Sequence, residues 1–198
     1  MLKGLLEEHK SLGIKIKGMA DRNTPENKKL MYKECDRIGS AIVTAVLERN
    51  YPCNCEPIPY NLFKGDLKLS PNPFTEPDEI CIEVKTETFM SDNLFMETSS
   101  NEETSAWIRT ATKQPMILIH SYPDKRNKLI LFDTEKLLPA LVSGKFGRSI
   151  ETRYNTTGVL FSIDSIEEVP GYIETISINK WIHYINSMGH PLETTFAE

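Results

Sequence analysis

The sequence predicts a mixed α/β fold, with a central mixed sheet flanked by helices. Apolar residues at helical spacing come first. Apolar segments with a period of two follow, with further helical segments between them. Segments of both kinds that share one hydrophobic core form a layered α/β domain. With 198 residues, of which 39% are hydrophobic and 26% charged, the chain can bury such a core and still solvate its surface.

The longest predicted helix covers residues 26–49. Thr24 is a suitable N-cap, Pro25 suits the first helical position, and Glu26 is favourable in the first turn. Its apolar stripe consists of Met31, Ile38, Ala41, Ile42, Ala45 and Val46. Before it, residues 1–23 predict an N-terminal extension, made of a short amphipathic helix and a basic connector that contains Lys15, Lys17 and Gly18.

Strands follow the proline-rich stretch 52–59. They are predicted at residues 62–69, 79–87, 94–98, 116–121, 128–132, 159–163 and 172–178. Helices are predicted at residues 101–113, 134–142 and 179–188, and residues 144–158 form a polar, partly basic loop. We therefore expect a single domain over residues 24–198, with its core at 26–142 and C-terminal strands and a helix at 143–198.

Composition narrows the class of protein. No apolar run approaches the roughly 18–20 residues of a membrane helix, and the N-terminal segment lacks the pattern of a secretory signal. The 4 cysteines are too few and too scattered for a disulfide scaffold. No P-loop, dinucleotide-binding or zincin motif occurs. We expect a cytoplasmic protein without a membrane partner.

Asp66, Glu83 and Lys85 are the candidate chemical centre. Pleating places Glu83 and Lys85 on one face of the predicted strand 79–87. If this strand pairs with the preceding one as a hairpin about residues 74–75, Asp66 lies across from Glu83. Two carboxylates held together need a balancing charge, which a divalent cation such as Mg²⁺ supplies. We expect Asp66 and Glu83 to bind this cation, with the Val84 carbonyl on the same strand edge as a third ligand.

These residues resemble the PD-(D/E)XK nuclease superfamily, in which an Asp and a Glu-x-Lys pair lie on consecutive strands after a long helix. Residues 86–107 and the later LILFDTEKLL resemble small nucleases of phages and mobile elements. The resemblance implies a restriction-endonuclease-like core, Mg²⁺- or Mn²⁺-dependent cleavage of DNA, and pairing of two copies as a homodimer. Gly65 replaces the usual proline before the Asp, and residues 143–198 match no motif.

Further residues have two interpretations each. Glu34 falls within the apolar stripe of helix 26–49; the resemblance implies a metal-linked Glu from this helix, but Glu34 can also pair with Arg37. Asp78, which follows Pro77, more naturally closes the loop before the strand. DNA contacts are expected from basic residues that an ordinary charged surface would explain equally well, namely Lys145, Arg148, Arg153, Arg109 and Lys113.

The leading functional hypothesis is a metal-dependent DNA endo- or exonuclease. The alternative is a non-catalytic module that uses the same fold to bind DNA or a protein. A third hypothesis is an unrelated small hydrolase or binding protein, in which Glu83 and Lys85 are a solvated pair and Asp66 a turn residue. The distance between Asp66 and Glu83 separates the third from the others, and cation binding separates the first from the second.

Overall fold

The computed structural model describes residues 1–19, 24–59, 65–87, 92–101, 103–123, 127–152 and 155–178. The helices are α1 (Leu2–Gly18), α2 (Pro25–Asn50), α3 (Ala106–Ala111), α4 (Thr134–Ser143) and the 3-10 helix η1 (Ile163–Glu168). The strands are β1 (Asn54–Pro57), β2 (Leu67–Ser70), β3 (Ile80–Thr86), β4 (Asn93–Ser100), β5 (Glu103–Thr104), β6 (Met116–Tyr122), β7 (Lys128–Asp133), β8 (Arg148–Glu151), β9 (Thr156–Ser162) and β10 (Tyr172–Ser177). The mixed α/β class is confirmed. None of the described helices has the length and apolar composition of a membrane span.

The strands form two sheets where the sequence indicated one. The first has 6 strands in the order β1-β2-β3-β6-β7-β10, and the second has 4 strands in the order β5-β4-β9-β8. In the first sheet β3 and β6 are parallel, and all other neighbours are antiparallel. A parallel pair needs a long crossover, and the chain between β3 and β6 supplies it by building β4, β5 and α3.

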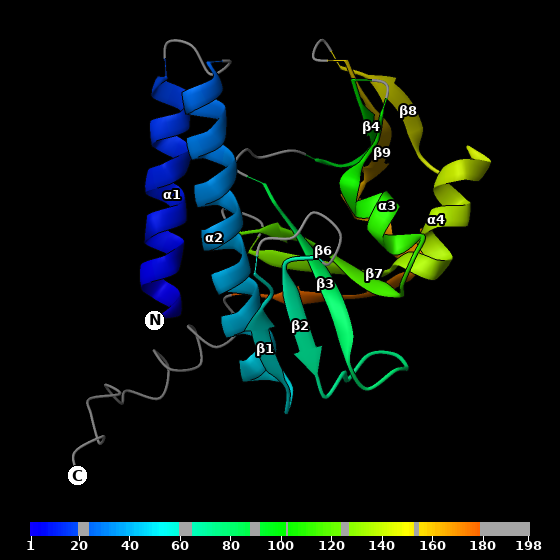
Figure 1. Cartoon of the computed structure of the whole chain (residues 1–198), viewed down its shortest axis with the longest axis horizontal. Helices are drawn as coiled ribbons and strands as arrows, with labels where there is room; N and C mark the ends of the chain where they lie inside the picture. Colours follow the sequence, from blue (N-terminus) through cyan, green and yellow to red (C-terminus); the bar gives the residue numbers. More distant parts are fainter. Residues whose placement is uncertain are drawn as a thin grey trace.

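The six-stranded sheet separates two layers of structure (Figure 1). Helices α1 and α2 lie on one side, and α3, α4 and the second sheet lie on the other. Strand β6 is buried along its whole length and serves both layers, because Ile117 and Ile119 join the first core whereas Leu118 joins the second. Helix α1 packs on α2, and its Leu12 and Ile16 belong to the first core.

Helix α2 confirms the predicted helix 26–49 and approaches β3 closely. The Thr24 side chain accepts a hydrogen bond from the Asn27 N–H at 3.3 Å, as expected of the N-cap. Halfway along the helix, a Cβ placed on Gly39 would lie 1.8 Å from Oγ1 of Thr86, the last residue of β3. Glycine therefore allows α2 to lie directly against the C-terminal end of this strand.

Four segments differ from the prediction. The first turn of the predicted helix 101–113 is instead β5, and α3 begins only at Ala106. The predicted loop 144–158 contains β8 and the start of β9. Strand β1 lies in the proline-rich stretch, at a sheet edge where Pro57 need not donate a ladder hydrogen bond. Helix α1 continues through Gly18, so the expected connector is helical. Residues 62–64 and the predicted helix 179–188 lie outside the described residues.

Candidate active site

The pairing of β2 with β3 brings Asp66, which directly precedes β2, close to Glu83. The ladder pairs Leu67 with Ile82, which is the register expected for a hairpin centred on residues 74–75. The Asp66 N–H donates to the Ile82 carbonyl at 2.8 Å, and the Val84 N–H donates to Asp66 Oδ2 at 2.7 Å. These two bonds hold Asp66 to the residues on either side of Glu83. The predicted register is confirmed.

The backbone conformation of Gly65 explains why a glycine precedes Asp66, where the resemblance would place a proline. Its φ is +79°, which is in the left-handed region that proline, with φ fixed near −65°, cannot adopt. A Cβ at this position would also lie 2.8 Å from the Ile82 carbonyl oxygen. In this chain the turn into β2 requires glycine in order to deliver Asp66 to the edge of β3.

Lys85 and Glu83 form an ion pair on one face of β3. The Lys85 Nζ donates to Glu83 Oε1 at 2.5 Å, and the side chains are 43% and 13% exposed, respectively. Burial lowers the pKa of Lys85. The negative charges of Glu83, Asp66 and Asp36 together raise it by more, so the pKa of Lys85 lies above its ordinary value. Lys85 is therefore positively charged at neutral pH, in contact with one carboxylate and near two more.

Asp66 is the most perturbed carboxyl of this centre. Burial and, after it, the negative charge of Glu83 raise its pKa to about 6, against the opposing effects of the Val84 N–H and Lys85. Both main causes act by disfavouring the ionised form. A cation bound between Asp66 and Glu83 would remove the repulsion, which makes this pair a receptive position for positive charge.

A cavity of about 800 Å³ surrounds the centre. Helix α2 forms one wall, α3 contributes Ala106, Trp107 and Thr110, and the segment around Asp66 together with β3 completes it. The α2 wall carries polar residues at a spacing of four: Asp36, Ser40, Thr44 and Glu48. Among the described lining residues the carboxylates are Asp36, Glu48, Asp66 and Glu83, and the cations are Arg37 and Lys85. The side chains of the described lining are therefore net negative, which favours cations.

Asp36, and not Glu34, is the carboxylate that α2 presents to the centre. Glu34 accepts a hydrogen bond from the Arg37 Nε at 3.1 Å, which is the alternative interpretation of this residue, and it does not line the cavity. Asp36 lines it, and burial first and then Glu83 raise the pKa of Asp36, whereas Lys85 lowers it. Asp78 closes the loop before β3, where its carbonyl accepts from the Asn72 N–H at 2.6 Å.

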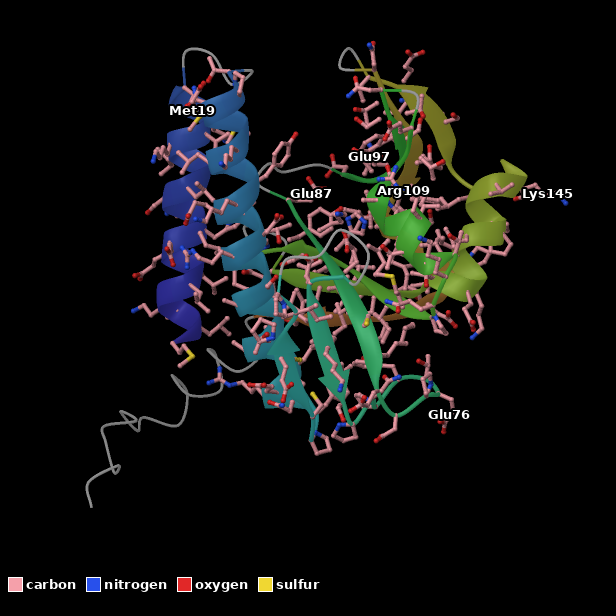
Figure 2. All side chains as sticks on the ribbon, viewed as in Figure 1. Met19, Glu76, Glu87, Glu97, Arg109 and Lys145 are labelled. Atoms are coloured by element: carbon pink, nitrogen blue, oxygen red, sulfur yellow. The ribbon has the colours of Figure 1, made fainter. Side chains whose placement is uncertain are left out.

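The basic residues expected to contact DNA are not gathered at the cavity. Arg109, Lys113, Lys145 and Arg148 are described and do not line it. Arg109 donates to the Thr104 carbonyl at 2.7 Å. Figure 2 shows Lys145 on the side of the molecule away from α2, whereas Glu87, which follows β3, lies between α2 and α3. Arg153 lies outside the described residues.

His120 is a neighbour of Lys85 to which the sequence assigned no role. The two residues pair across β3 and β6, and His120 is 2% exposed, with its ring edge-on to Phe132. Burial, and after it the charge of Lys85, lowers the pKa of His120 to about 3. The imidazole is therefore neutral and adds no positive charge behind Lys85.

The donor set at this centre fits a hard divalent cation. The Val84 N–H points to Asp66, and because the N–H and C=O of one strand residue share an edge, the Val84 carbonyl faces the same side. Two carboxylates and a carbonyl, completed by water, suit Mg²⁺. Among the residues that the structure describes, no group of three or more His, Cys, Asp or Glu side chains is arranged around a metal position. Only two such side chains, Asp66 and Glu83, are needed here.

Comparison with known proteins adds no relative. No family model matches the chain, and neither the curated proteins nor the solved structures give a significant match. The chemistry of this site is therefore inferred from its own residues and their geometry.

Proposed function

We propose that this protein is a metal-dependent nuclease that hydrolyses phosphodiester bonds of DNA on a restriction-endonuclease-like core. The observation that supports this most is the position of Asp66 beside Glu83, where it is hydrogen-bonded to Ile82 and Val84, with Lys85 hydrogen-bonded to Glu83 in the same cavity. Two carboxylates and an ammonium in this arrangement suit hydrolysis of a phosphodiester. The resemblance of these residues to the PD-(D/E)XK superfamily supports DNA as the substrate, and two copies acting on two strands as the assembly.

Asp66, Glu83 and the Val84 carbonyl hold Mg²⁺ or Mn²⁺ in this proposal. When bound, the cation lowers the pKa of a coordinated water and shields the negative charge of the phosphate. Asp66 is kept in position for this role by its bonds to the backbone of β3. Its raised pKa predicts that cation binding weakens below about pH 6, because protons then compete for the carboxylate.

Lys85 supplies the positive charge that the reaction needs in addition to the cation. Its contact with Glu83 keeps the ammonium at the centre, and Asp36 on α2 adds a second attraction from the opposite wall. From there it can hydrogen-bond the attacking water or a non-bridging oxygen of the transition state. Neutral His120 beside it adds no second positive charge.

Calorimetric titration with Mg²⁺ and with Mn²⁺ tests the cation site. The wild type should bind one divalent cation, and Glu83→Ala should bind at least about tenfold more weakly, because a partly buried carboxylate ligand is lost. Glu79→Ala is the matched control, since Glu79 precedes β3, is exposed and pairs with Lys68 at 2.8 Å. Equal affinity in the wild type and Glu83→Ala would contradict the proposal. DNA binding without cation binding would favour the non-catalytic module.

A further inference from the structure

The described lining of the cavity contains only two positively charged side chains, and one of them has no role in the proposed reaction. Lys85 belongs to the centre itself, whereas Arg37 lies on α2 directly after Asp36. Its side chain is 48% exposed, so it lies at the rim. A polyanion that enters this net negative cavity meets one favourable side chain at the α2 rim, and that side chain is Arg37.

Arg37 is held by two carboxylates, of which Glu8 is exposed and Glu34 is partly exposed. Its guanidinium bonds Glu8 of α1, and its Nε and Nη2 donate to Glu34 Oε2 at 3.1 and 3.0 Å. The Glu8 and Glu34 side chains are 46% and 30% exposed. Exposed ion pairs contribute little to stability and exchange partners easily. Like a carboxylate, a phosphodiester offers a pair of charged acceptor oxygens that a guanidinium can bind together, so it can replace these carboxylates.

We infer that Arg37 binds a phosphate of the nucleic-acid backbone next to the scissile one, and that Glu8 and Glu34 compete with this phosphate for the guanidinium. The inference deepens the proposed nuclease function and rests on it. It places the substrate strand along the α2 rim of the cavity, on the opposite side of the molecule from Lys145. It also makes Glu8, on the neighbouring helix, a determinant of substrate affinity.

The first experiment measures cleavage kinetics at saturating Mg²⁺ over a range of KCl concentrations. Arg37→Ala should raise KM by more than it lowers kcat. The slope of log KM against log [salt] should fall by about 0.9 for duplex substrate, or about 0.7 for a single strand, because one phosphate contact is lost. Arg49→Ala is the control, since Arg49 is exposed on α2 outside the cavity. Identical KM values and salt slopes in the two variants would overturn the inference.

The second experiment isolates the competition. Glu8→Gln and Glu7→Gln each remove one exposed negative charge from adjacent positions of α1, but only Glu8 contacts Arg37. Glu8→Gln should lower KM more than Glu7→Gln does, and the difference should disappear when Arg37→Ala is also present. If Arg37 only ties α1 to α2, its variant melts at a lower temperature with no change in KM, which contradicts the inference. A wild type that cleaves nothing overturns the proposed function and the inference together, whereas a wild type and an Arg37→Ala variant with equal KM overturn the inference alone.

Discussion

Asp66 occupies a position in which its ionised form destabilises the folded protein. Burial and the nearby Glu83 raise its pKa to about 6, compared with about 3.9 for a free Asp side chain. Between these two values the folded state binds a proton that the unfolded state does not, so the contribution of Asp66 to stability falls as the pH rises. Above pH 6 the full destabilisation is present unless a cation occupies the site.

The variant Asp66→Asn should therefore stabilise the cation-free protein. Asn keeps an oxygen that can accept the Val84 N–H, but it carries no charge. At pH 8 in EDTA its free energy of unfolding should exceed that of the wild type by about 1–3 kcal/mol, and this gain should shrink as the pH falls from 6 towards 4. Urea unfolding at several pH values measures it. A variant no more stable than the wild type at pH 8 would show that Asp66 is not held against Glu83.

Substitution of Lys85 tests whether its ammonium acts in the reaction. Lys85→Ala should lower turnover by roughly 10²–10⁴-fold, the range for a positioned catalytic group. The affinity for Mg²⁺ should change little, because Lys85 is not a ligand. Lys85→Arg should restore only part of the rate, since the planar guanidinium is larger than the compact ammonium and places its donors differently. Kinetics at saturating Mg²⁺ measure this, and rates near that of the wild type in both variants would assign Lys85 to the solvated surface.

At the scale of secondary-structure elements, the contact between α2 and β3 positions Asp36 relative to Lys85. Gly39→Ala should weaken this contact, because its Cβ would overlap Oγ1 of Thr86 at 1.8 Å and force the helix outward. We expect a loss of about 1–3 kcal/mol in unfolding free energy, despite the better helix propensity of alanine. Thermal or urea unfolding measures this loss.

Gly4→Ala is the control for helix propensity. Gly4 lies in α1, and a Cβ added to it would have no neighbouring atom within 4 Å, so alanine there should be neutral or stabilising by up to about 1 kcal/mol. If Gly39→Ala behaved like Gly4→Ala, α2 and β3 would not be in close contact, and the position given to Asp36 would be wrong.

Elements with a strong period were predictable and edge strands were not. Helix α2 and strand β3 each show one buried face, which the alternation of apolar residues reveals directly. Strand β8 is exposed on nearly every residue and lies at the edge of the second sheet, so its sequence is that of a polar loop. Strand β1 contains Pro57, which ordinarily argues against a strand.

Local pairing also decided which parts of the candidate site could be predicted. Asp66 and Glu83 meet through the short β2–β3 connection, so symmetry about residues 74–75 was enough to place them. Asp36 reaches the centre because α2 packs against the C-terminal end of β3, which is a contact between elements that periodicity does not reveal. Asp36 also lies outside the apolar stripe of the helix. The second sheet depends on β4 pairing with β9, which are far apart in the sequence and carry no pairing signal.

At the scale of the whole molecule, two layers flank the six-stranded sheet (Figure 1). Helices α2 and α3 contribute to the walls of one cavity, and the side chains of its described lining are net negative. The structure gathers there the partly buried carboxylates of Asp66 and Glu83 and the more exposed Asp36, and it places Lys85 among them. Carboxylates in such a cavity attract a divalent cation and repel an anion. A phosphodiester should therefore bind there only when a cation neutralises part of this negative charge. We propose that a cation and Asp66 act together to cleave DNA.

Side-by-side cleavage of linear, circular, branched and single-stranded DNA, by wild type and by Asp66→Asn purified in the same way, tests this claim most directly. The wild type should cleave at least one of these substrates with Mn²⁺ or Mg²⁺ and none in EDTA, while the folded variant should cleave none, because the cation loses a ligand. Failure of the wild type to cleave any of them, or equal cleavage by the variant, would contradict the claim.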